Sequence, residues 1–408
     1  MQLHKRESGI ALVVTLWLIS ILLIVSAVIV QTTTHSFRFG TAQKLKFRAF
    51  YASEAGASHI LGHYYNNPAD FSSKQSAANM GFATSSPSQA TFGQDLAYWI
   101  FSIIYDSATP PAWVEIESHG TVIGTGTDQG ILSRWGVQHD SPFRFGAFGN
   151  YGVTLSGQGY VDSYNSNNGP WSFVTHRTNG NTGTNSTSEG AITLGGQAKV
   201  YGSAQVGPGG NPETAISISG QADILGSKTA ATQLKDMTPK SDPGGGTPLT
   251  IHNGDIIGSG QYRVSSLKLS GQSVVRIAGA VTMYISGDFQ MSGQSEIIIE
   301  PTASLTLYVS GSFDMSGQGI INQANKPANL LVYGTSTCTS VKLSGQADFY
   351  GGVYAPMALG HFTGQADIFG SVITDTFFAS GQGSIHFDEN LLNLGPVTKF
   401  KLISWKWL

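Results

Sequence analysis

Cysteine and charge are both scarce in this chain. A single cysteine, Cys338, stands among 408 residues, so neither an internal disulfide nor a cysteine-based zinc site can form. Charged residues make up only 12% of the chain, and the formal net charge is -3. No basic stripe is visible, so we expect no nucleic-acid partner. Glycine, by contrast, is abundant at 51 residues, and together with many Val, Ile, Phe and Tyr residues it indicates a β-rich secreted protein.

A three-residue word, Ser-Gly-Gln with small variations, recurs about ten times between Ser156 and Gln382. The copies begin at Ser156, Gly195, Ser219, Ser259, Ser270, Ser292, Ser316, Ser344, Thr363 and Ser380. In the later part of the chain successive copies are mostly about 17 to 28 residues apart. A fixed word at repeated spacing indicates one structural unit used many times.

The best-preserved repeat alternates strictly between two kinds of side chain. From Val341 to Ala355 the odd-numbered residues are all apolar or small, and the even-numbered residues are mostly polar or aromatic. This period of two is typical of a half-buried strand. Stacked units of strand, corner and strand would bury a continuous core. We therefore expect a mainly β protein in which residues 146–392 form a parallel β-helix (solenoid), preceded by a long N-terminal hydrophobic α-helix.

The glycine of each word is expected to face inward where the wall bends, because a corner leaves no room for a Cβ. The glutamine is expected to face outward, where copies ~4.8 Å apart could form a ladder of amide hydrogen bonds. The alternative is that glutamine is merely a tolerated surface residue. The predicted corner and ladder residues are Gly157, Gln158, Gly196, Gln197, Gly220, Gln221, Gly271, Gln272, Gly293, Gln294, Gly317, Gln318, Gly345, Gln346, Gly364, Gln365, Gly381 and Gln382.

The stretch from Ile10 to Val30 is almost wholly apolar and follows a short charged leader. About 20 such residues suffice to cross the hydrocarbon core of a bilayer as a helix. Three interpretations compete. The segment is a signal peptide cleaved after Val25-Ser26-Ala27, an uncleaved signal anchor, or the leader and helix of a type IV prepilin.

A family resemblance favours the third interpretation. The segment Gly9–Trp17 resembles the start of PilX-type minor pilins and of the K-type minor pseudopilin of type II secretion. Gln31–Thr34 and the word AFYASEAGA at Ala49–Ala57 match the N-terminal helix of the same family. The resemblance implies that a prepilin peptidase cuts between Gly9 and Ile10, and that the helix then packs with other pilins or pseudopilins.

Two observations qualify this resemblance. The fifth mature residue would be Val14, where major pilins carry a glutamate that pairs with a neighbour's N-terminal amine; its loss resembles minor subunits at a filament tip. Arg38, Lys44, Lys46 and Arg48 follow the span, so the positive-inside rule would place the C-terminal side in the cytoplasm. The glycine-rich β composition instead favours an external location, which we adopt.

The repeat region has a resemblance of its own. Gly152–Trp171, Leu343–Pro356, Gly383–Leu391 and Ile403–Lys406 are similar to an uncharacterised domain found behind PilX-type N-termini. That family more often has Ser-Gly-Asn in place of Ser-Gly-Gln. The resemblance implies a fold and a context but no activity.

These features predict a division of the chain into segments. Residues 1–9 are the leader, 10–65 the transmembrane and pilin-like helix, and 66–145 a linker with a small α/β segment. Residues 146–392 follow as the β-helix. Residues 393–408 form a C-terminal tail, in which Trp405 and Trp407 could cap the open end of the β-helix.

Candidate chemistry is sparse in the repeats. Asp223, Asp348 and Asp367 share one place in a Gly-Gln-Ala-Asp word. Asp348 and Asp367 lie about one repeat apart, so their carboxylates could attract a cation such as Ca²⁺, although two solvated carboxylates are the simpler reading. We expect no metal site, no cofactor and no catalysis.

Other candidates have simpler explanations. His59 and His63 share a helix face without a third metal ligand, and a packed or surface pair explains them. His361, Ser380 and Asp388 could be imagined as a triad, but Ser380 belongs to the repeat word. A further group of aromatic residues is expected to face outward or lie in loops, where it could bind sugar or protein unless a loop or the tail covers it. These residues are Tyr350, Tyr354, Phe369, Phe377 and Phe378.

The sequence thus predicts a structural minor pilin-like subunit of a type IV pilus or type II secretion pseudopilus. It would cross the bacterial inner membrane once and display a β-helix in the periplasm or on the cell surface, for filament assembly or adhesion to a carbohydrate or protein. The alternative is a secreted β-helix protein that binds or degrades polysaccharide. A lesser alternative is a scaffold whose β-helices associate end to end.

Overall fold

A computed structural model describes residues 7–85, 90–91, 95–106, 111–345, 347–395 and 397–408. The chain divides into two compact units, Met1–Gln138 together with Val397–Leu408, and His139–Pro396. A mainly β protein with a long apolar N-terminal helix, as the sequence predicts, is confirmed.

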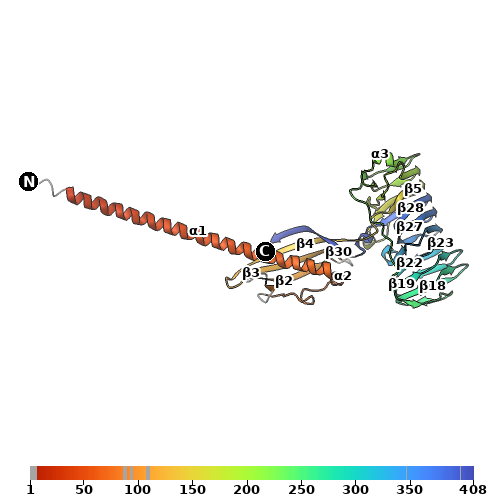
Figure 1. The fold of residues 1–408 in the computed structure, drawn as a ribbon, viewed down its shortest axis with the longest axis horizontal. Coiled ribbons are helices and arrows are strands. Elements are labelled where there is room, and N and C mark those ends of the chain that lie inside the picture. Colours follow the sequence, from red (N-terminus) through yellow and green to blue (C-terminus); the bar gives the residue numbers. More distant parts are fainter. Residues whose placement is uncertain (1–6, 86–89, 92–94, 107–110, 346, 396) are drawn as a thin grey trace, which may run out of the picture. The chain divides into compact units, whose positions relative to one another are not determined.

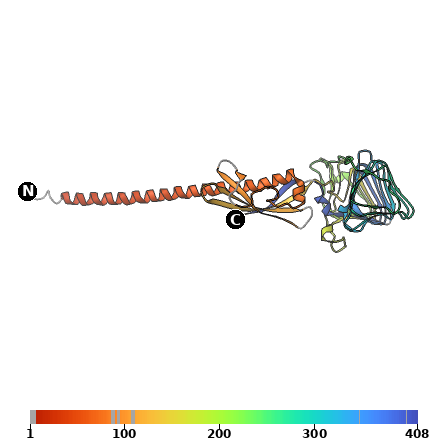
Figure 2. The same ribbon diagram turned by 90° about the horizontal axis from the view of Figure 1, so that it is seen from below.

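The first unit combines one long helix with an antiparallel sheet (Figure 1). Helix α1 (Glu7–Asn66) runs through residues without proline, and it ends just before Pro68, which opens the short helix α2 (Pro68–Ser72). The sheet has the order β1-β2-β3-β4-β30. Its strands are β1 (Ala90–Thr91), β2 (Leu96–Tyr105), β3 (Trp113–Val122), β4 (Thr127–His139) and β30 (Val397–Trp407). The C-terminal part of α1 covers one face of this sheet, as both views show (Figure 2).

The C-terminal segment differs from its expected role as a cap. It forms β30, the edge strand beside β4, where Leu408 N donates to Gly130 O at 3.0 Å. Phe50 of α1 contacts Trp405 and Trp407 with ring centroids 5.5 and 4.4 Å apart. The expectation that these tryptophans cap the repeat domain is therefore wrong. Residues 139–396 are inserted between two neighbouring strands of one sheet.

The second unit consists of strands of 2 to 16 residues whose named pairings are all parallel. Its strands are β5 (Ala147–Gly157), β6 (Tyr160–Tyr164), β7 (Thr182–Thr184), β8 (Ile192–Gly196), β9 (Lys199–Val200), β10 (Ala204–Val206), β11 (Ile216–Ile218), β12 (Asp223–Ile224), β13 (Lys228–Ala230), β14 (Thr247–Pro248), β15 (Ile256–Ile257), β16 (Gly260–Val264), β17 (Leu267–Leu269), β18 (Val274–Ile277), β19 (Ala280–Ile285), β20 (Phe289–Met291), β21 (Glu296–Ile299), β22 (Ser304–Val309), β23 (Phe313–Gly317), β24 (Gly319–Asn322), β25 (Leu330–Gly334), β26 (Ser340–Gly345), β27 (Phe349–Gly364), β28 (Ile368–Gly381) and β29 (Ile385–Asp388). Short helices lie at Ser166–Asn168, Pro212–Ala215, Pro327–Asn329 and Glu389–Asn393. Alternate side chains, such as Val341, Leu343 and Val353, enter one continuous core.

The order of the strands does not follow the order of the chain. Strand β5, the first of this unit, lies between β28, the last long strand, and β8. The chain therefore proceeds from β5 to β13 in one direction along the stack. A segment without long strands, residues 231–246, then leads to the opposite end, where β14 pairs with β16. From there the strands return layer by layer until β28 meets β5.

The crossing segment is held along its length. Asn185 Oδ1 accepts the backbone N–H of Lys235 at 2.8 Å, and the Lys235 ammonium donates to Pro142 O at 2.7 Å. Burial and the neighbouring Arg144 lower the pKa of Lys235 to about 8. Tyr354 Oη donates to Thr238 O at 2.9 Å, and Arg263 pairs with Asp242 at 2.7 Å. The segment thus connects layers that are far apart in sequence.

The word glycines occupy corners, but not with the orientation expected. Backbone φ is positive at Gly157, Gly196, Gly220, Gly271, Gly293, Gly317, Gly364 and Gly381. A Cβ at Gly220 would lie 2.7 Å from Gly196 O, and one at Gly196 would lie 2.7 Å from Gly157 O. The expected inward orientation is therefore wrong at these corners, because the missing Cβ would point along the stack at a glycine of the neighbouring layer; at Gly271 a Cβ would meet nothing within 4 Å. The word at Ser259 differs from these corners, because Gly260 begins β16 and pairs with Val281, which is not a word glycine.

Candidate functional site

The N-terminal half of α1 is an apolar helix without cover in this chain. Side chains from Leu12 to Val30 are all exposed, and α1 is the one helix in the described part of the chain that is long and apolar enough to cross a membrane. Val14 lies in this stretch and is exposed. Gly9 and Ile10 belong to α1, but their side chains lie outside the described part of the structure. Such a surface requires a membrane or other helices around it.

The AFYASEAGA word forms the seam between α1 and the sheet. Ala49, Ala52 and Ser53 are fully buried, at spacings that place them on one side of the helix. A Cβ on Gly120 of β3 would overlap the backbone of Ala49 and Ser53, so glycine is required there for the two backbones to touch. A Cβ on Gly56 would instead overlap two side chains of the sheet, those of Ser118 and Tyr98. The small residues of the word are thus explained by close helix–sheet packing.

Aromatic rings close the end of this seam. Tyr64 and Phe71 contact Phe400 of β30, with ring centroids 6.2 and 5.9 Å apart. The hydroxyls of Tyr64 and Tyr105 are 2.5 Å apart, and burial raises the pKa of both groups. Arg48 pairs with Asp95 near the other end of the seam. The helix is therefore fixed to the sheet at both ends of their contact.

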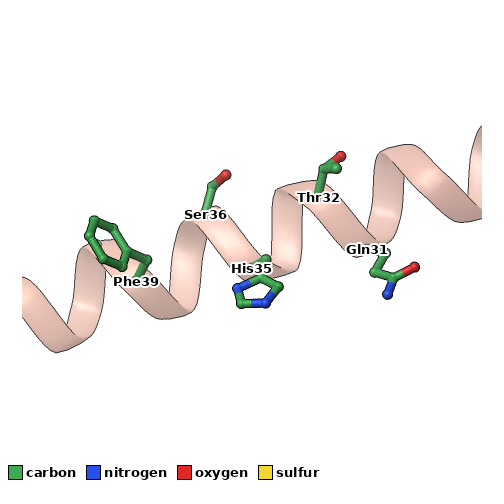
Figure 3. A pocket seen from close by; sticks show the side chains of 6 residues that line it. Gln31, Thr32, His35, Ser36 and Phe39 are labelled. Atoms are coloured by element: carbon green, nitrogen blue, oxygen red, sulfur yellow. The ribbon is translucent and has the colours of Figure 1, made fainter.

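A hollow beside α1 is lined by Gln31, Thr32, His35, Ser36, Phe39 and Gly40. Figure 3 shows these side chains projecting from one helix in different directions. No second element provides a wall among the lining residues described. The hollow is open helix surface on α1, between the apolar span and the part of α1 that packs on the sheet, and no second element encloses it.

His59 and His63 of α1 each have their own hydrogen-bond partner. His59 Nδ1 hydrogen-bonds the hydroxyl of Tyr98, and His63 Nε2 lies 2.8 Å from Asp70 Oδ2. Phe82 packs against both imidazole rings. Among the residues that the structure describes, no group of three or more His, Cys, Asp or Glu side chains could hold a metal.

Two of the three repeat aspartates accept backbone hydrogen bonds from the next layer. Asp348 Oδ1 accepts the N–H of Asp367 at 3.0 Å, and Asp367 Oδ1 accepts the N–H of Ser384 at 2.7 Å. Asp223 differs, because its Oδ1 accepts the N–H of Ile224, the next residue in its own strand. The bonds of Asp348 and Asp367 therefore give these two carboxylates a structural role between layers.

A buried ionic cluster, which sequence reasoning missed, lies next to these aspartates. His386 is fully buried, with Nδ1 2.7 Å from Asp162 Oδ1 and Nε2 3.5 Å from Asp367 Oδ2. Trp171 packs against the imidazole with ring centroids 4.0 Å apart and donates its indole N–H to Asp162 at 2.9 Å. Burial lowers the pKa of His386, but the two carboxylates outweigh it, and the net direction is upward. No local motif could have revealed the cluster, because Asp162 and His386 are far apart in sequence.

The imagined triad is not assembled. Asp388 is buried and accepts bonds from Ser166 N and Oγ, at 2.9 and 2.7 Å. His361 stacks on Phe378 of the next layer at 5.3 Å, and Ser380 is paired in the strand ladder with Thr363. These three residues therefore have separate structural partners.

The aromatic residues expected to face outward are mostly covered. Tyr354, Phe369 and Phe377 are buried, while Tyr350 and Phe378 are half-buried. Tyr354 lies under the crossing segment, and Phe369 stacks between Tyr350 at 4.3 Å and His386 at 4.7 Å. The expectation of an exposed aromatic platform is wrong for the buried three. Loop cover, the alternative considered from the sequence, explains Tyr354.

The word glutamines of the described corners are exposed. Gln197 Nε2 donates to Gln221 Oε1 at 3.3 Å, and Gln272 Nε2 donates to Gln294 Oε1 at 3.2 Å. Both bonds join neighbouring layers. Gln346 lies outside the described residues.

In comparisons with known proteins, part of the chain matches a family model. Residues 220–394 match a family model described as "Domain of unknown function (DUF7305)". Among solved structures, the chain is similar to the competence-associated pilin ComZ from Thermus thermophilus, with 11% identity and a TM-score of 0.27; the match covers 89% of this chain and 97% of that chain. No curated protein matches the chain. At this level of similarity, function has to be argued from the chain's own residues.

Proposed function

We propose that this chain is a minor pilin-like structural subunit, anchored by α1 in the bacterial inner membrane before assembly. The observation that carries the proposal is the division of α1 into an exposed apolar half and a half fixed by small residues to an antiparallel sheet. The exposed half would pack among the helices of other pilins or pseudopilins. Prepilin peptidase would cut between Gly9 and Ile10, and Val14 would leave a neighbouring N-terminal amine unpaired.

We further propose that residues 139–396 form a parallel β-helix. Parallel pairing repeated from layer to layer, one continuous core and positive-φ glycine corners support this architecture. The two glutamine pairs support an amide ladder along one edge of the stack. The domain would be displayed in the periplasm or on the filament surface.

Adhesion is a second role, favoured by one exposed loop. Phe173 and Val174 are 69% and 94% exposed, although Trp171 fixes the base of their loop on Asp162 and His386. A rigid apolar tip is suited to binding a surface carbohydrate or protein. Binding of surface glycans or host proteins should fall in a Phe173→Ser/Val174→Ser variant, and an unchanged profile would remove this role.

Mass spectrometry of the mature protein tests the principal proposal. An N-methylated Ile10 N-terminus, together with recovery of the chain in sheared surface filaments, is the expected result. A mature N-terminus at Val28, an intact Met1, or absence from filaments in cells that assemble them would refute it. A Gly9→Val variant, which blocks cleavage, serves as the control and should remain in the membrane unprocessed.

A further inference from the structure

Aromatic side chains gather on the outer surface of the strand stack beside β6 and β9. Tyr160 is the first residue of β6, and Tyr201 follows β9 in the next layer, with the two ring centroids 5.7 Å apart. Phe173 packs against Tyr160 with ring centroids 6.1 Å apart, and His176 packs against Tyr201 at 5.3 Å. We refer to these four residues as the aromatic step. Two layers of the stack and one loop therefore contribute to a single surface.

The loop that carries Phe173 and His176 has a fixed conformation. His176 Nδ1 lies 2.8 Å from Phe173 O, and Ser172 Oγ accepts the N–H of Thr175 at 3.2 Å. Trp171, at the base of the loop, contacts the Phe173 ring with centroids 5.1 Å apart. Phe173 nevertheless remains 69% exposed. A ligand therefore meets a ring that is already in place, and little conformational entropy is lost when it binds.

Two charged side chains flank the aromatic step in neighbouring strands. Lys199 of β9 is paired in register with Tyr160 of β6 on one side and with Asp223 of β12 on the other. Both charged residues are exposed, and the residues that follow them, Val200 and Ile224, are buried in the core. Neither Lys199 nor Asp223 takes part in an ion pair within the described part of the chain. The ammonium is a donor and the carboxylate an acceptor, so the hydroxyl groups of a ligand find both kinds of partner beside the rings.

The size and the chemistry of the aromatic step distinguish between possible ligands. An aromatic side chain presents 150–250 Å², so the exposed part of Phe173 amounts to roughly 100–170 Å². A stable protein partner usually covers about 800 Å² on each side, so these rings alone are too small for a protein interface. A pyranose ring is smaller, with apolar C–H groups on one face and hydroxyl groups around its edge. Aromatic rings beside a donor and an acceptor match such an amphipathic unit, and the opposite charges of Lys199 and Asp223 favour an uncharged sugar.

We propose that the aromatic step binds an uncharged pyranose unit of a surface carbohydrate. The C–H face of the sugar lies on Phe173 and Tyr201, while Lys199 donates hydrogen bonds to its hydroxyl groups and Asp223 accepts them. The proposal rests on the adhesion role, because it names the class of ligand for that role. It also assigns the polar part of the site to residues outside the Phe173 loop.

Saturation-transfer NMR of the full chain tests this site, in micelles of a detergent that has no sugar headgroup. The probes are the methyl glycosides of glucose, galactose and mannose, together with N-acetylglucosamine, and methyl glucuronide is the acidic counterpart. At least one uncharged probe should receive saturation at its ring C–H protons, and a glycan array should bind the same sugar. Tyr201→Ala and Lys199→Gln should each raise the Kd about tenfold, because one removes a ring face and the other a charged donor. Tyr201→Phe should keep most of the affinity, since it retains the ring.

Tyr151→Ser is the matched control, because Tyr151 is an aromatic residue of β5 that is 67% exposed and lies outside the aromatic step. This variant should leave the Kd unchanged. The sugar site would be overturned by the absence of binding to every uncharged probe, by binding of the glucuronide alone, or by an equal loss of affinity in Tyr151→Ser. Loss of binding to a protein in Tyr201→Ala, without any sugar binding, would assign the step to a protein and overturn it as well.

The same chain is followed in sheared filaments, so that the two proposals are separated. Normal recovery in filaments without sugar binding would remove the sugar site and leave the pilin-like function in place. Absence from filaments would refute the pilin-like function, whereas the sugar site is decided by the Kd values of the variants.

Discussion

Gly120 is the residue on which contact between α1 and the sheet depends most directly. A Cβ there would overlap the carbonyl of Ala49 and the amide of Ser53, which are backbone atoms of a rigid helix. Neither can move as a flexible side chain would, so Gly120→Ala must push the helix from β3. Overpacking of this kind costs about 1–3 kcal/mol, and occasionally more. For a unit of this size, that corresponds to a fall in Tm of roughly 2–4 °C for each kcal/mol.

Scanning calorimetry of the full chain in detergent measures this effect. We expect the transition of the helix–sheet unit to fall by about 4–10 °C, while the transition of residues 139–396 stays in place. Gly62→Ala is the control, because Gly62 lies on α1, the helix that Gly120 contacts, and a Cβ there meets nothing within 4 Å. Helix propensity should make that variant neutral or stabilising by up to about 1 kcal/mol. If Gly120→Ala behaves like Gly62→Ala, the close-contact reasoning is refuted.

Three further predictions concern the strand stack. The pKa of His386 is raised above its unfolded value, so its contribution to the free energy of unfolding should be complete below about pH 6.5 and should be lost as the pH rises through the raised pKa. Urea unfolding at a series of pH values should show this fall in the free energy of unfolding, and His386→Gln should abolish it. In calorimetry, Gly317→Ala should lower the Tm of the stack more than Gly271→Ala does. Both glycines have positive φ, but of the two only Gly317 would place a Cβ against the backbone of a neighbouring glycine, Gly293. Equal falls in Tm would show that φ alone matters. Asp367→Asn should lower thermal stability without any Ca²⁺ dependence, and a Tm raised by millimolar Ca²⁺ in the wild type would show that the carboxylates do bind the cation.

The sequence was informative where a signal is local. Alternation around Val341 predicts which side chains enter the core, and Pro68 marks the end of α1, because both depend on residues within one turn or strand. The order of layers carries no such signal. The sequence pattern of β5 does not distinguish among partner strands of similar pattern, and only the structure shows that β28 is one of its neighbours.

Failures in predicting sites have a related cause. Tyr354 alternates as an outward residue should, yet residues of the crossing segment cover it, and no sequence rule connects Thr238 with Tyr354. His386 appears isolated because its partners Asp162 and Asp367 come from other layers. Parallel stacking brings together residues that are distant in sequence, so ionic clusters in such a unit are invisible until the register is known.

The insertion of residues 139–396 has a consequence for folding order. Strand β30 must reach β4 across the whole inserted unit, and the entropy of closing such a loop in an unfolded chain grows with its length. Within the inserted unit, however, His139 Nδ1 lies 3.0 Å from Gly395 O, so the two ends of the insertion are already together when it is folded. Once the inserted unit is folded, the end of β4 and the start of β30 are close together, so almost no loop remains to be closed when these strands pair. We infer that the inserted unit folds first and that the sheet of the helical unit closes last, with the aromatic contacts of Phe400 and Trp407 sealing the seam on α1.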